Sequence, residues 1–215
     1  MPAALALSLG ACASTPGAPA DAASAPASPP ATRPAPASPQ AFAEVVKGAT
    51  REDGHLPTWR RDDKVWIELA PARLGQPFLL TINITGSVGQ RGLYASQMGR
   101  SWLVEWRRVG DRLQLIALNT AVRADGDAAL SRAVREGYSD SLLAALPLAS
   151  APHPQHQAVL VDASFLLGDI AGYGSAIESA FRLSYTLDRA NSQIERVRQS
   201  ERLTAVQVRQ HHTVP

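Results

Sequence analysis

The sequence predicts an α+β fold, made mainly of antiparallel β-sheet with a few short helices and preceded by a disordered tether. Apolar and polar residues alternate in several segments after residue 41, as they do in half-buried strands. Apolar residues at helical spacing occur only in short segments. Before residue 41 the chain is rich in Ala, Pro and Ser. We therefore expect three parts: residues 1–12, 13–40 and 41–215.

The first part, residues 1–12, resembles the signal peptide of a bacterial lipoprotein. Its apolar run AALALSLGAC is too short to span a bilayer but has the length of a signal-peptide hydrophobic region. The run ends at Cys12 after a Leu and two small residues, the position at which a lipoprotein cysteine receives lipid. The sequence departs from that pattern in one respect: no Lys or Arg precedes the apolar run, and the first basic residue is Arg33. A sequence that starts too late, within the signal peptide, would show this departure. The resemblance implies lipidation of Cys12 and export to the periplasm or cell surface, anchored to a bacterial membrane; the alternative is an unstructured N-terminus with an accidental cysteine.

The second part, residues 13–40, contains no large apolar residue. Such a segment cannot bury enough surface to offset the entropy lost on ordering. We therefore expect a disordered and fairly extended tether between the lipidated cysteine and a folded region.

The folded region, residues 41–215, begins with elements that have clear periods. AFAEVVKGA predicts one short amphipathic helix that ends at Gly48. HLPTWRRDDKVWIEL predicts two strands joined at Asp62 and Asp63. In the second of these strands, Val65, Ile67 and Leu69 fall on one face, and the opposite face carries Lys64, Trp66 and Glu68. This alternation predicts a half-buried framework strand.

The next segments predict further antiparallel strands. After the turn segment PARLGQ, the alternation in PFLLTINIT predicts a strand. A glycine-bearing loop follows, from Gly86 to Arg100. SWLVEWRR and DRLQLIALN then predict a hairpin around Gly110 and Asp111.

The pattern changes after Asn119. DAALSRAVREG predicts a helix, and SDSLLAALP a short helix capped by Ser139 and ended by Pro147, although either segment could be an edge strand instead. QAVLVDASFLLGD predicts a buried strand at residues 159–161 and then a helical turn. After a flexible GYGS segment, FRLSYTL and LTAVQVRQ predict strands. Because the chain breaks off directly after a predicted strand, we expect the folded region to be incomplete at its C-terminal end.

Composition argues against several classes of function. The formal net charge is +2 with both signs interspersed, so we expect no nucleic-acid partner. GSVGQRG lacks the spacing of a phosphate-binding loop, and no Gly-x-Ser-x-Gly or HExxH motif occurs.

Histidines occur at His55, His153, His156, His211 and His212. The proline inside HPQH prevents a regular helical turn between two of them, so solvated loop histidines are preferred over a zinc site. We predict no catalytic residue and no metal ligand in this chain.

The four tryptophans are Trp59, Trp66, Trp102 and Trp106. Tryptophans in strands are most often packed in a core, and packing is the preferred interpretation here. The alternative is an exposed docking surface for a partner, such as a downstream domain.

An ordered series of phrases resembles the N-terminal region of large bacterial zinc-dependent metalloproteases. The phrases are FAEVVKGATREDGHLPTWRRDDKVWIEL, LGQPFLLTINIT, GDRLQLIALNTAVRA, SDSLLAALPL and YTLDRANSQIERVR, and the resemblance covers nearly everything from Phe42 to Pro215. In that family two N-terminal domains of unknown function precede a metzincin-like catalytic domain with an HExxHxxGxxH zinc motif. This chain contains no such motif, so no catalytic residue or zinc ligand is carried over.

Two functional hypotheses follow. In the first, preferred one, the chain is the accessory region of an exported zinc-dependent metalloprotease; it is not itself catalytic, its partner is a downstream peptidase domain, and zinc belongs to that domain. In the second, it is a stand-alone envelope lipoprotein that binds a peptide or an envelope protein.

Overall fold

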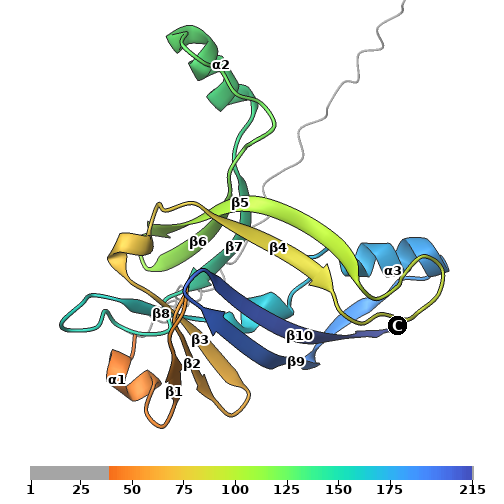
Figure 1. Cartoon of the computed structure of the whole chain (residues 1–215), viewed down its shortest axis with the longest axis horizontal. Helices are drawn as coiled ribbons and strands as arrows, with labels where there is room; N and C mark the ends of the chain where they lie inside the picture. Colours follow the sequence, from red (N-terminus) through yellow and green to blue (C-terminus); the bar gives the residue numbers. More distant parts are fainter. Residues whose placement is uncertain (1–38, 215) are drawn as a thin grey trace, which may run out of the picture. The chain divides into compact units, whose positions relative to one another are not determined.

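The structure, a computed structural model, describes residues 39–214. The predicted signal peptide with Cys12, and the predicted tether as far as residue 38, lie outside the described residues. The predicted fold class is confirmed, because the described part is mainly antiparallel β-sheet with short helices (Figure 1). In this part no helix is long and apolar enough to cross a membrane.

The strands form two four-stranded antiparallel sheets and a two-stranded hairpin. The first sheet, in the order β1-β2-β3-β8, contains β1 (Thr50–Glu52), β2 (Thr58–Arg61), β3 (Lys64–Leu69) and β8 (Val159–Asp162). The second sheet, in the order β4-β5-β6-β7, contains β4 (Phe78–Ile84), β5 (Gln97–Val109), β6 (Arg112–Ala117) and β7 (Ser141–Pro147). The hairpin consists of β9 (Thr186–Ser200) and β10 (Leu203–Thr213). In this arrangement β7 and β8 are edge strands of different sheets.

The helices are short; α1 precedes the first strand and the others lie between strands in the sequence. They are α1 (Phe42–Val45), α2 (Ala128–Gly137) and α3 (Tyr173–Phe181), with 3-10 helices η1 (Pro71–Arg73) and η2 (Ala163–Leu167). The carboxylate of Asp127 caps α2 by accepting the N–H groups of Ala129 and Leu130. None of the residues of α2 is buried, so this helix adds nothing to the core.

The main core takes side chains from both sheets and from the hairpin. Val65, Ile67 and Leu69 enter it from β3, as their alternation predicts. From β5, Trp106 is only 1% exposed and lies edge-on to Phe165 of η2, with ring centroids 6.0 Å apart. Other buried members are Leu56, Val104, Leu113, Leu115, Ala117, Val159, Val161, Ala163 and Ile194.

A second, smaller cluster covers the other face of the first sheet. Phe42 and Val45 of α1 pack there against Trp66, Ala158 and Leu160. β3 is therefore more than half-buried, because α1 packs on Trp66, which lies on the face that we expected to be polar.

Both predicted tight turns are confirmed by strand pairing. Arg61 pairs with Lys64 across the Asp62–Asp63 turn, where Asp62 has a φ of 51°. Asp tolerates this left-handed conformation better than most residues. Val109 pairs with Arg112 across the second turn.

Four of the predicted elements were wrong or incomplete. The loop expected from Gly86 to Arg100 ends earlier, because β5 begins at Gln97. SDSLLAALP forms the edge strand β7, the alternative that the sequence allowed, rather than a short helix capped by Ser139. The GYGS segment begins helix α3, because the carboxylate of Asp169 accepts the N–H groups of Tyr173 and Gly174. The strand expected in FRLSYTL lies further along the chain, since β9 begins only at Thr186.

Candidate functional site

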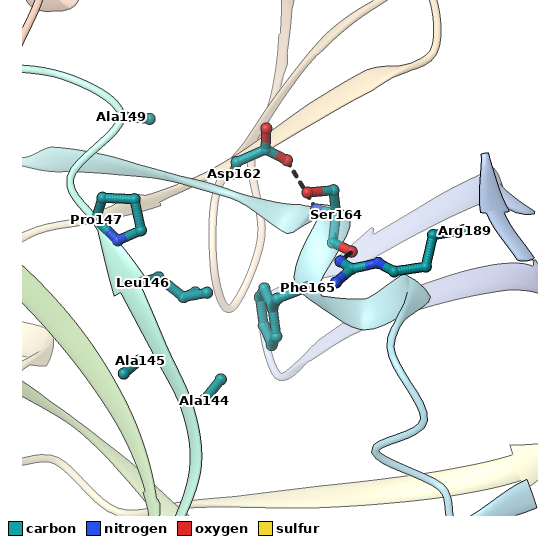
Figure 2. A pocket seen from close by; sticks show the side chains of 9 residues that line it. All are labelled: Ala144, Ala145, Leu146, Pro147, Ala149, Asp162, Ser164, Phe165 and Arg189. Carbon is teal, nitrogen blue, oxygen red and sulfur yellow. Dashed lines mark hydrogen bonds between the residues drawn. The ribbon is translucent and has the colours of Figure 1, made fainter. Parts of the chain in front are cut away.

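A cavity of about 540 Å³ lies between edge strand β7 and the segment in which β8 leads into η2 (Figure 2). Its volume is in the range that holds small ligands or part of a peptide. The lining residues are Ala144, Ala145, Leu146, Pro147, Ala149, Asp162, Ser164, Phe165 and Arg189. The first four belong to β7, so one wall of the cavity is a strand.

The β7 wall is the open edge of its sheet. β7 pairs with β6 on one side, and no strand of the described part pairs with it on the other. Its sequence SLLAALP contains no charged residue, although natural edge strands commonly carry charges that prevent pairing with another chain. Leu142 within it is 55% exposed. The edge of residues 141–146 is thus chemically suited to accept a further strand, and Pro147, which has no N–H, limits pairing at its end.

The opposite wall is built by the turn from β8 into η2. The carboxylate of Asp162 accepts the N–H of Ser164 at 2.8 Å and caps η2. Phe165 follows, and Figure 2 shows Leu146 of β7 pointing toward its ring. Both side chains also pack in or against the main core, so the cavity is an apolar opening at the margin of that core.

Arg189 of β9 brings a positive charge to the cavity. Its Nη2 donates a hydrogen bond to the carbonyl oxygen of Ser164 at 3.0 Å. None of the ion pairs within residues 39–214 includes Arg189. Asp162 and Arg189 are the only charged residues in the lining.

The chemistry of the lining favours binding over catalysis. The walls offer apolar side chains, a strand edge, one hydroxyl, one carboxylate and one guanidinium. Activating a hydroxyl as a nucleophile requires a neighbouring base, usually a histidine, and no histidine is among the lining residues. The arrangement can hold an extended chain, with apolar contacts and with one polar group at Arg189.

A second group of polar side chains surrounds Glu68, on the face of the first sheet that α1 covers. Glu68 is 8% exposed. Its Oε2 accepts a hydrogen bond from Arg51 Nε at 3.1 Å and another from Trp59 Nε1 at 2.7 Å. Arg51, Trp59 and Glu68 come from β1, β2 and β3, so these bonds join three adjacent strands.

The electrostatics of Glu68 follow from these contacts. Burial by itself would raise the pKa of its carboxyl. The hydrogen bonds from Arg51 and Trp59, together with the positive charges of Arg51 and His156, outweigh burial and lower the pKa below its ordinary value of 4.5. Glu68 is therefore held as a carboxylate in a structural network.

The two histidines of the HPQH segment lie near this network. The rings of His153 and His156 stack at a centroid distance of 3.7 Å with an interplanar angle of 8°. Phe42 of α1 lies edge-on to both rings. His156 is exposed and His153 half-buried, so both are loop histidines, as predicted, and Phe42 is their aromatic neighbour. Among the described residues no group of three or more His, Cys, Asp or Glu side chains is arranged to hold a metal ion.

The four tryptophans divide between the two clusters. Trp66 and Trp106 are 5% and 1% exposed, so the preferred interpretation of packing describes them. Trp59 and Trp102 are half-buried, with Trp59 against the α1 cluster and Trp102 against the main core. A docking role for these two stays a prediction.

Reasoning from sequence singled out none of the cavity-lining residues. The uncharged, apolar SLLAALP segment was the available signal, because an edge strand without charges suggests a binding edge. Arg189 carried no signal, since one arginine in a polar segment is ordinary.

Comparison of the chain with protein-family models, with curated proteins and with solved structures finds no match. The candidate site is thus described by its own geometry alone.

Proposed function

We propose that the folded region is a non-catalytic module that binds an extended peptide segment along the open edge of β7. The observation that carries this proposal is the position of the cavity, which lies beside Ala144, Ala145, Leu146 and Pro147 of a strand that pairs with β6 on one side only (Figure 2). A peptide added to a sheet edge forms main-chain hydrogen bonds, and pockets for its side chains supply specificity. Here the apolar wall at Phe165 provides such a pocket.

The resemblance gives this module a biological setting. We propose that it is the accessory region of an exported zinc-dependent metalloprotease, in which it holds a segment of the protein substrate for a downstream peptidase domain. In this proposal lipid on Cys12 anchors the protein to a bacterial membrane. Zinc serves the downstream domain. The proposal rests on the ordered phrases between Phe42 and Pro215.

The second candidate function keeps the same cavity but places it in a stand-alone envelope lipoprotein. The unpaired, uncharged edge of β7 supports it equally, because a peptide from any envelope protein could pair there. Sequencing the source DNA in frame past the codon for Pro215 separates the two settings. An HExxHxxGxxH motif supports the metalloprotease setting, and a stop codon immediately after Pro215 supports the stand-alone one.

Peptide binding itself is tested with the full chain and a fluorescent peptide of seven residues, the length of β7. The peptide alternates Thr and Val and is acetylated and amidated, so that it is neutral and prefers an extended conformation. We expect saturable binding. Ala144→Phe, which adds an aromatic ring to the cavity wall, should weaken binding by about tenfold or more. The control is Ala129→Phe on the exposed surface of α2.

Two modified peptides test the mode of binding without changing the protein. One is N-methylated at every Val and the other at every Thr. Because alternate N–H groups of a strand point to opposite sides, only one set faces β7, and only one of the two peptides should lose binding. Equal binding by both peptides would contradict strand addition.

A further inference from the structure

We propose that Arg189 binds a carboxylate of the peptide, so that the site selects segments with an acidic side chain or a free C-terminus next to the apolar residues that enter the cavity. This inference rests on the proposed function, since it names the chemistry of the peptide that β7 would hold. Arg189 and Phe165 both line the cavity, so a charged contact and an apolar contact are available within one site (Figure 2).

The guanidinium of Arg189 has donors to spare. An arginine has several N–H donors in a fixed planar arrangement. Only one bond from the side chain of Arg189 is made within the described part, from Nη2 to the carbonyl oxygen of Ser164. This bond holds the group near the η2 turn and leaves other N–H groups for a ligand. The planar geometry of those groups matches a carboxylate, which arginine binds with paired hydrogen bonds.

No carboxylate of the described part neutralises Arg189. Arg51, Arg107 and Arg209, which also lie on strands, each form an ion pair with an acidic side chain. Other strand arginines of the described part, such as Arg60 and Arg198, form none, so what distinguishes Arg189 is its position in the cavity lining. Arg189 forms none, although Asp162 lines the same cavity. The Oδ1 of Asp162 instead accepts the N–H of Ser164.

The guanidinium of Arg189 therefore offers a contact to an anionic group, while Asp162 brings the opposite charge to the same lining. Asp162 sits on the other side of the Ser164 turn and would repel a carboxylate placed beside it. A peptide carboxylate is thus expected at Arg189 and not midway between the two charges.

The experiment compares three peptides on the full chain by fluorescence anisotropy. The first is the neutral, blocked Thr/Val peptide. The second has the same sequence with a free C-terminal carboxylate, and the third is blocked but has one Thr replaced by Glu. The last two separate the two sources of the carboxylate. We expect at least one of them to bind about tenfold more tightly than the neutral peptide, as a charge-assisted hydrogen bond implies.

The variants assign that advantage to Arg189. Arg189→Gln should bind the neutral peptide as the wild type does but lose the preference for a carboxylate. Arg189→Lys, which keeps the charge without the planar arrangement, should retain part of it. The control Arg198→Gln removes the same charge from an exposed position on the same strand and should retain the full preference.

Each outcome is decisive. If the neutral peptide binds and neither carboxylate strengthens binding, or if Arg189→Gln retains the preference, the inference about Arg189 is overturned while the proposed function stands. If none of the peptides binds, the proposed function fails and the inference fails with it. Equal urea midpoints for wild type and Arg189→Gln ensure that a lost preference is not a folding defect.

Discussion

Arg189 Nη2 donates a hydrogen bond to the carbonyl oxygen of Ser164 at 3.0 Å, and this bond ties β9 to the turn that forms one wall of the cavity. The two residues are 25 positions apart in the sequence. Nothing in the local sequence of either indicates their contact. The bond places a positive charge at the side of an otherwise mostly apolar opening, and the proposed preference for a peptide carboxylate depends on that placement.

Glu68→Gln should destabilise the fold. The variant removes the carboxylate that joins three strands and leaves Asp53 as the remaining charged partner of Arg51. We expect a loss of about 1 to 2 kcal/mol in the free energy of unfolding, since Arg51 remains partly hydrated. Urea unfolding measures it, with Glu201→Gln in the exposed turn between β9 and β10 as the control. An unchanged midpoint for Glu68→Gln would show that the network contributes nothing to stability.

The same carboxylate predicts a dependence of stability on pH. Because folding lowers the pKa of Glu68, the stabilisation is fully present above the ordinary value of 4.5 and is lost as the pH falls through the lower folded value. The pKa of Asp140 is lowered by the N–H of Asn119 and by Arg107, so its contribution has the same sign.

Urea unfolding between about pH 7 and about pH 3 tests this dependence. Glu68→Gln should lose less stability on acidification than the wild type, because Gln does not titrate. Glu201→Gln should follow the wild type. Parallel curves for wild type and Glu68→Gln would mean that the pKa of Glu68 is the same in the folded and unfolded states.

The tryptophans should differ sharply in their effect on stability. Trp106→Ala empties a buried position against Phe165 and should cost about 3 to 5 kcal/mol. Trp102→Ala, at a half-buried position of the same strand, should cost about 1 to 2 kcal/mol. Denaturant titrations compare the two. A larger loss for Trp102 would contradict the assignment of Trp106 to the core.

The purified chain should show no zinc-dependent cleavage of a protein substrate. No HExxH motif occurs in the sequence, and the candidate site has the chemistry of a binding site. Casein incubated with the full chain and added zinc should remain intact. Proteolysis that a chelator abolishes and zinc restores, in material free of other proteases, would refute a non-catalytic role.

The alternation of apolar and polar residues along the sequence predicted the strands that bury a single face. The alternation in KVWIEL placed Val65, Ile67 and Leu69 correctly in the main core. It could not show that α1 would pack on Trp66 on the other face, because that burial depends on a segment more than twenty residues away in the sequence.

The candidate site was not predictable for a related reason. β7 has no clear period, and pairing with β6 makes it a strand instead of a helix. β9 is polar over most of its length, and its long pairing with β10 specifies it. A cavity bounded by one edge strand, one turn and one strand of a hairpin exists only after all three have assembled.

Hydrogen exchange of the full chain with and without the neutral Thr/Val peptide tests the central claim most directly. A strand added to the open edge would pair with the N–H groups of β7 that have no strand partner, so amides in residues 141–146 should exchange more slowly. Pro147 has no N–H and gives no signal. β4, the opposite edge of the same sheet, is the internal control and should be unaffected. Protection confined to β7 is the predicted result. Saturating peptide with no change at β7, or with protection at β4 instead, would contradict the claim that this chain binds peptides at the edge beside the cavity.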